Sequence, residues 1–116
     1  MKMDRIKAGQ VAADADQDIA PWMAGHADKV AAFLKALSHE GRLMILCHLA
    51  GGEKSVTELE GLLGQRQAAV SQQLARLRLE GLVSTRREGK AIIYRIEDAK
   101  VLPLLDLVPQ IMPESD

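Results

Sequence analysis

Residues 65–81 read Gln65-Arg66-Gln67-Ala68-Ala69-Val70-Ser71-Gln72-Gln73-Leu74-Ala75-Arg76-Leu77-Arg78-Leu79-Glu80-Gly81. Val70, Leu74 and Leu77 recur at positions i, i+4 and i+7 of a helical period, so we expect them to face inward. The outward face is small, amide-rich and basic instead of alternating Glu and Lys, and it comprises Ala68, Ser71, Gln72, Ala75 and Arg76. Such a face suits base edges and phosphates better than water. The stretch is therefore a candidate DNA-recognition helix.

The composition is that of an ordinary globular domain, with 116 residues of which 47% are apolar and 27% charged. No apolar run approaches the roughly 18 residues that a membrane span requires, and no basic-then-apolar signal pattern opens the sequence. We therefore expect a cytoplasmic protein with no membrane partner. The single cysteine, Cys47, excludes an internal disulfide and a cysteine-rich zinc site.

The net charge of −1 conceals a strong asymmetry along the sequence. Between Arg66 and Arg95 lie seven basic and two acidic residues, a net charge of +5. From Glu97 onward lie five acidic residues and one basic residue, a net charge of −4. The basic segment contains the candidate recognition helix, which indicates an anionic partner.

A second helix is predicted immediately before the candidate recognition helix. Ser55-Val56-Thr57-Glu58 is a capping box, in which a hydroxyl is followed three residues later by Glu, and it opens a short helix that ends at Gly64. A tight turn from Gly64 to Arg66 then leads into the next helix, which Gly81 terminates. This order of helix, turn and helix is expected of a helix-turn-helix motif.

A β-hairpin is predicted directly after this motif. The β-rich runs 82–87 and 91–96 are joined through Glu88-Gly89-Lys90, where Gly is available for a positive φ. A hairpin in this place forms a wing, and the basic residues near its tip can reach the sugar-phosphate backbone or the minor groove. Those residues are Arg86, Arg87 and Lys90.

Helices are also predicted upstream of the motif. Residues 1–16 show no sustained period and indicate a flexible arm. Apolar spacing over 19–37 predicts a short helix, a break near Gly25 and a longer helix. Ser38 is the expected cap of a further helix that ends at Gly51-Gly52 and is apolar over most of its circumference. Its predicted stripe is Leu43, Leu46, Cys47 and Ala50, widened by Met44, Ile45 and Leu49.

The last predicted helix follows Asp98, which we expect to cap it. Its residues leave almost no polar face, so one side can cover the core and the other requires a partner, most simply a second copy of the chain. Pro103 and Pro109 are expected to bend or segment it. The sequence thus predicts a mainly α winged helix-turn-helix domain over 17–112, followed by a short tail at 113–116.

Three stretches resemble the arsenic-repressor (ArsR/SmtB) family of bacterial winged-helix repressors. They are Ala36-Leu37-Ser38-His39-Glu40-Gly41-Arg42-Leu43-Met44-Ile45-Leu46, residues 70–83 and Arg86-Arg87-Glu88-Gly89-Lys90-Ala91-Ile92-Ile93-Tyr94. The similarity covers about residues 30–108 in the family's order and spacing. It implies a homodimer, joined through the first and last helices, that binds a double-stranded DNA operator with a two-fold repeat and releases it when an inducer acts.

Within the family, Ile45-Leu46-Cys47 and residues 71–77 look most like the sulfide and persulfide sensors of the BigR/SqrR/HlyU type. The resemblance implies a sensor thiol at Cys47 and a second cysteine just beyond the last helix. Residues 109–116 contain no cysteine, so the intramolecular switch cannot operate in this chain. Two interpretations of Cys47 remain open, a small core residue or a reactive thiolate.

The predicted DNA-binding residues divide by chemistry. Amide, hydroxyl and methyl groups that suit base edges in the major groove belong to Gln67, Ala68, Ser71 and Gln72. Basic side chains that suit phosphates belong to Arg76, Arg86, Arg87 and Lys90. Arg78, nearer the inward flank, and Arg66, in the turn, are candidates for structural roles.

Other function classes find little support in the sequence. His26, His39 and His48 are too scattered to predict a metal site, and His39 beside the cap favours a structural hydrogen bond. No nucleophile elbow, phosphate loop or plausible carboxylate pair indicates an enzyme, and no cofactor is expected. The primary prediction is a dimeric repressor, with a thiol response through Cys47 left open. The alternative is an inducer-free DNA-binding or protein-interaction module with Cys47 in the core.

Overall fold

The computed structural model describes residues 18–64, 67–112 and 114. The chain divides into two units between Ala32 and Phe33, within helix α2 (Ala27–Leu37). In the first unit, residues 18–24 are helical and a turn at 25–26 precedes α2, which confirms the predicted break. The rings of Trp22 and His26 stack there with their centroids 4.1 Å apart.

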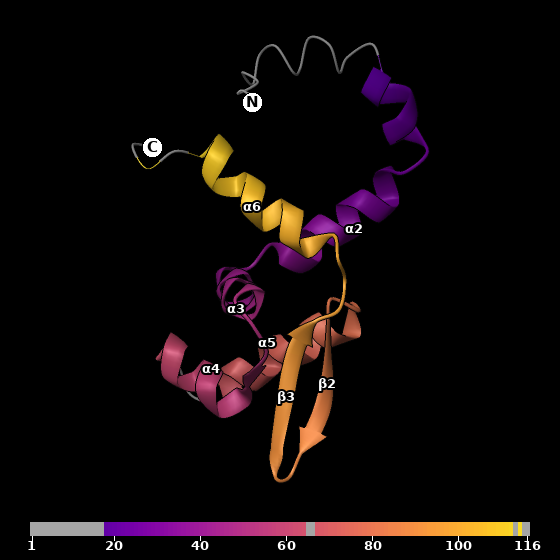
Figure 1. Ribbon diagram of the computed structural model, residues 1–116. Coiled ribbons are helices and arrows are strands. Elements are labelled where there is room, and N and C mark those ends of the chain that lie inside the picture. Colours follow the sequence, from indigo (N-terminus) through magenta and orange to yellow (C-terminus); the bar gives the residue numbers. More distant parts are fainter. Residues whose placement is uncertain (1–17, 65–66, 113, 115–116) are drawn as a thin grey trace. The chain divides into compact units, whose positions relative to one another are not determined.

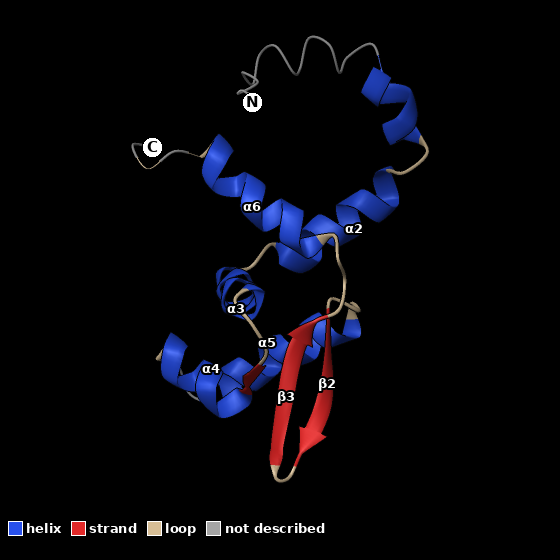
Figure 2. Cartoon of the chain, viewed as in Figure 1, coloured by secondary structure: helices blue, strands red, loops and turns tan. Residues whose placement is uncertain are grey.

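The second unit has the element order of a winged helix-turn-helix (Figure 1). After the end of α2 come α3 (Glu40–Ala50), β1 (Lys54–Ser55), α4 (Val56–Leu63), α5 (Gln67–Leu79), β2 (Val83–Glu88), β3 (Ala91–Ile96) and α6 (Val101–Ile111). The predicted hairpin is present as β2 and β3, and β1 adds a short third strand that the sequence analysis missed (Figure 2). The sheet is antiparallel in the order β1-β3-β2.

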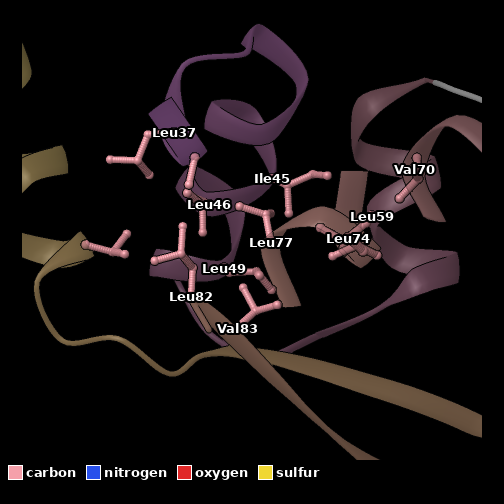
Figure 3. Close-up of a cluster of buried hydrophobic side chains, with 12 residues drawn as sticks. Leu37, Ile45, Leu46, Leu49, Leu59, Val70, Leu74, Leu77, Leu82 and Val83 are labelled. Atoms are coloured by element: carbon pink, nitrogen blue, oxygen red, sulfur yellow. The ribbon is translucent and has the colours of Figure 1, made fainter. Parts of the chain in front are cut away.

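The core of this unit gathers side chains from all of its helices and from β2 (Figure 3). Val70, Leu74 and Leu77 of α5 have no exposed surface, so the inward face predicted for the recognition helix is confirmed. They pack in one cluster with Ala36, Leu37, Ile45, Leu46, Leu49, Leu59, Leu82, Val83 and Val101. This cluster fixes which side of α5 remains exposed.

Two predicted helix caps are wrong by one or two residues. His39, not Ser38, is the N-cap of α3, because its extended backbone lets Nδ1 accept a hydrogen bond from the Gly41 N–H at 2.9 Å. Lys100, not Asp98, precedes α6 and makes no side-chain cap. Asp98 instead accepts from the Lys100 backbone N–H at 3.0 Å and from Nζ of the same residue. The structural role predicted for His39 is confirmed.

The stripe predicted for α3 is confirmed only in part, at Leu46 and at Ile45 and Leu49, which were expected to widen it. The helix buries Ile45, Leu46 and Leu49, whereas the other predicted members, Leu43, Met44, Cys47 and Ala50, are exposed. Because α3 is apolar on several sides, its sequence period does not define which side packs. The prolines do not segment α6, which is one helix with Pro109 inside it. Pro103 lies in the first turn, where backbone N–H groups have no acceptor within the helix, so its missing N–H costs no hydrogen bond.

Candidate nucleic-acid interface

Helix α5 exposes all four predicted base-reading residues, Gln67, Ala68, Ser71 and Gln72. Ala68 and Gln72 lie opposite the buried side chains of the helix, Ser71 lies to the side, and Gln67 lies next to the buried stripe at the start of the helix. An exposed face of amide, hydroxyl and methyl groups matches the donors, acceptors and thymine methyl of a major groove. Gln65 and Arg66 lie outside the described residues.

The entry to α5 is set by local features of α4. Ser55 Oγ accepts a hydrogen bond from the Glu58 N–H at 3.1 Å, while Glu58 Oε1 accepts one from the Ser55 N–H at 2.7 Å. The predicted capping box is thus confirmed, and the bond from the Ser55 N–H lowers the pKa of Glu58. Gly64 ends α4 in the left-handed conformation, at φ 65°, which residues with a side chain rarely adopt.

The three predicted cations of the wing, Arg86, Arg87 and Lys90, occupy different positions on the hairpin. Glu88 pairs with Ala91, so Gly89 and Lys90 form a two-residue turn in which Gly89 has φ 62°. Arg86 and Arg87 lie on consecutive positions of β2, and their side chains therefore point to opposite faces of the hairpin. All three basic residues are exposed.

Arg86 is held by two carboxylates. Its Nη2 donates to Glu88 Oε2 at 2.8 Å, and its Nη1 donates to Glu53 in the loop before β1. The bonds to Glu88 and then Glu53 raise the pKa of Arg86 further above its already high ordinary value. Sequence reasoning missed Glu53, because nothing local indicates that it would meet a side chain 33 residues away.

The other predicted phosphate contacts differ in whether they form ion pairs within the chain. Arg76 pairs with Glu80, one turn later in the chain, at 3.1 Å. Among the described residues, no ion pair involves Arg87 or Lys90. Arg78, which lies next to the buried stripe on the helical wheel, is exposed. Of the predicted phosphate contacts, Arg87 of β2 and Lys90 of the hairpin turn therefore meet the least competition from carboxylates of the same chain.

A polar junction behind α5 was not predicted. Arg42 of α3 donates from Nε to the Ala36 carbonyl at 2.7 Å and from Nη1 to Gln73 Oε1 at 3.0 Å. The Gln73 amide nitrogen lies 3.4 Å from His39 Nε2. These side chains connect the end of α2, the start of α3 and the flank of α5. Their partners are separated by up to 34 residues, so no local sequence signal reveals them.

Cys47 is exposed on α3, which contradicts its interpretation as a core residue in this chain. Leu43 and Met44 are exposed on the same helix, so the thiol lies on an apolar surface. Across the described ranges, no three His, Cys, Asp or Glu side chains gather in a way that could hold a metal ion. No helix within those ranges is long and apolar enough to cross a membrane.

Comparison with known proteins shows the family. Residues 39–85 match the arsR family of bacterial regulatory proteins. The biofilm growth-associated repressor of Agrobacterium fabrum is 50% identical over 86 residues, which are 74% of this chain and 74% of that protein. The chain belongs to the arsR family. It is thus a DNA-binding transcriptional regulator, as the helix-turn-helix and wing indicate.

Solved structures of this arsR family agree with the winged-helix fold. The transcriptional repressor BigR from Xylella fastidiosa is 47% identical, with a TM-score of 0.74, covering 78% of this chain and 92% of that one. Reduced HlyU from Vibrio cholerae N16961 is 38% identical, with a TM-score of 0.73, covering 79% of this chain and 97% of that one. The family and fold that the sequence resemblance implied are therefore confirmed.

Proposed function

We propose that this arsR-family chain is a cytoplasmic repressor, not an enzyme, which binds a two-fold operator as a homodimer through α5 and the wing. The observation that carries this proposal is the exposed face of Ala68, Ser71 and Gln72 opposite a fully buried stripe. Gln67 and the same face would meet base edges, whereas Arg76, Arg86, Arg87 and Lys90 would meet phosphates. Two related proteins are named as repressors, which supports repression of transcription as the function of this chain.

The reading face is tested by operator selection followed by titration. Duplexes selected by the wild-type protein should show an inverted repeat with half-sites about 10 bp apart or more, since one dimer spans two half-sites. Gln72→Ala should weaken binding to the selected operator and spare a scrambled duplex, because an amide reads bases and carries no charge. Equal operator titrations for Gln72→Ala and the wild-type protein would remove Gln72 from the reading face.

The homodimer is supported by the surface of α6. Leu102, Leu107, Val108 and Ile111 are exposed on this helix although all four are large and apolar. A second copy related by a two-fold axis would cover such a surface with its own equivalent. We assign the dimer domain to 17–112, between an arm at 1–16 and a tail at 113–116.

Sedimentation tests this assembly. Ile111→Asp should shift the protein toward a monomer and weaken operator binding, because it places a charge in the apolar seam. Leu62→Asp is the matched control, since Leu62 is likewise a large apolar side chain that is exposed, but on α4. If the wild-type protein sediments as a monomer at concentrations at which it binds the operator, the homodimer proposal is rejected.

We further propose Cys47 as the thiol through which reactive sulfur or oxidants act. The exposure of Cys47 supports access by a small reagent. A solved structure of the related HlyU is described as its reduced form, which fits redox chemistry in that protein. Operator binding should be compared for reduced protein, polysulfide-treated protein and Cys47→Ser. If treatment produces no mass shift and no change in operator affinity, sensing through Cys47 is rejected and an inducer-free regulator is favoured.

A further inference from the structure

The buried stripe of α5 is narrow for a helix whose rotation must be defined. Val70, Leu74 and Leu77 are the only described α5 residues in the buried core, and they lie within roughly 60° of the helical circumference, whereas a core-facing stripe usually spans about 100° or more. The positions that flank this stripe are polar, with exposed Gln67 and Arg78 on one side and half-buried Gln73 on the other. Apolar packing is non-directional, so this stripe resists rotation of α5 about its own axis only weakly.

A directional contact is present on one flank of the stripe. Gln73 precedes buried Leu74 and its Oε1 accepts from Arg42 Nη1 at 3.0 Å. Arg42 is itself anchored, because its Nε donates to the Ala36 carbonyl at 2.7 Å and its Nη2 lies 3.5 Å from the Lys35 carbonyl. Both carbonyls are at the C-terminal end of α2, where helical carbonyls lack intrahelical partners. One planar guanidinium therefore joins two helices with fixed geometry.

The surroundings of Gln73 restrict its orientation further. Because Oε1 faces Arg42, the amide NH2 faces His39, 3.4 Å from Nε2. A neutral imidazole has one acceptor nitrogen, and in His39 the bond from the Gly41 N–H occupies Nδ1. The approach to Nε2 is thus a packing contact. A Cβ at Gly41 would lie 3.2 Å from the His39 ring and 3.6 Å from Gln73 Cγ, so glycine permits this close arrangement.

We propose that Arg42 and Gln73 are positioning residues that fix the rotation of α5 and thereby the alignment of its reading face. The inference rests on the proposed role of that face. A helix with its side chains has a radius of about 6 Å, so a 10° rotation displaces a side-chain tip by about 1 Å. Hydrogen bonds to bases tolerate only a few tenths of an ångström. Phosphate contacts from the separate wing are much less sensitive to this rotation.

The link predicts a loss of specificity and not of general DNA affinity. Gln73→Met keeps the side-chain length, leaves Arg42 bonded to α2 and removes only the contact with α5. It should lower the ratio of scrambled-duplex Kd to operator Kd about tenfold, with the scrambled-duplex Kd changed less than about twofold. Arg42→Lys, which keeps the charge but loses the fork, should act in the same direction. Arg78→Lys is the matched control on an exposed part of α5.

The test measures both Kd values at one salt concentration, together with Tm, for the single variants, the Arg42→Lys/Gln73→Met double variant and Gln72→Ala. The double variant should be no worse than the more impaired single variant, because either change already breaks the link. An unchanged ratio in folded Gln73→Met, or a double variant showing the product of both losses, overturns the proposal. If Arg42→Lys is unstable, Gln73→Met decides alone.

The same data separate this inference from the proposed function. Loss of operator binding in Gln72→Ala with an unchanged Gln73→Met rejects only the positioning role. No effect of Gln72→Ala on the selected operator rejects the reading face, and the inference falls with it.

Discussion

Replacing Glu53 by Gln should increase the affinity of the wing for DNA. In the free protein, both terminal nitrogens of Arg86 are occupied, one by Glu53 and one by Glu88. A phosphate must displace at least one carboxylate before it can bind Arg86 in the bidentate manner that guanidinium favours. The side chains of Arg86 and Glu53 are 48% and 42% exposed, so solvent screens their pairing and the exchange is feasible.

The size of the effect follows from charge. Glu53 and Glu88 leave the three wing cations Arg86, Arg87 and Lys90 with a local net charge of about +1, and Glu53→Gln raises it to about +2. One additional phosphate contact steepens the dependence of log affinity on log salt by about 0.9. Between about 50 and about 200 mM salt, the variant should therefore lose about 3.5-fold more affinity than the wild-type protein.

Fluorescence anisotropy with a labelled scrambled duplex, repeated over a salt series, measures this slope. Glu97→Gln is the matched control, because it makes the same charge change at the opposite end of the hairpin, where Glu97 lies 3.4 Å from Arg95. Equal slopes for Glu53→Gln and Glu97→Gln would refute the competition between Glu53 and phosphate. So would weaker binding by Glu53→Gln at low salt, which would mean that Glu53 supports the wing.

Three further changes test other parts of the fold. Leu74→Ala should lower the free energy of unfolding by about 3 kcal/mol, measured in urea, because it empties a fully buried site. Lys90→Ala should flatten the salt dependence of DNA binding by about 0.9, and by more than Arg86→Ala does, since Arg86 is already paired. The lowered pKa of Glu58 stabilises the fold above the ordinary carboxyl pKa, and this contribution is lost as pH falls through the folded-state value. Glu58→Gln should therefore lower Tm at neutral pH and converge with the wild-type protein in acid.

The elements that the sequence predicted well are specified by neighbours in the chain. Val70, Leu74 and Leu77 define one face by their spacing, and the surrounding polar residues leave no competing face. The capping box needs only Ser55 and Glu58, three residues apart. For these features, the information that selects the conformation lies within one or two helical turns.

Where the prediction failed, local alternatives were nearly equivalent. Ser38 and His39 both offer a side-chain acceptor near the start of α3, and the extended backbone at His39 decides between them. Strand β1 consists of two residues and exists because Lys54 pairs with Tyr94, 40 positions later in the chain. A pattern confined to a short window cannot distinguish such a strand from a loop.

The candidate interface combines both kinds of specification. Periodicity decides which residues of α5 face outward, so Gln72 could be predicted from the sequence. The rotation of that face also depends on Arg42 and Gln73, which are 31 residues apart, and the charge available to the wing depends on Glu53. Substitutions at these supporting positions can therefore alter operator selection or salt dependence while every residue predicted to contact DNA stays the same. A change in DNA preference within this family need not originate in the recognition helix.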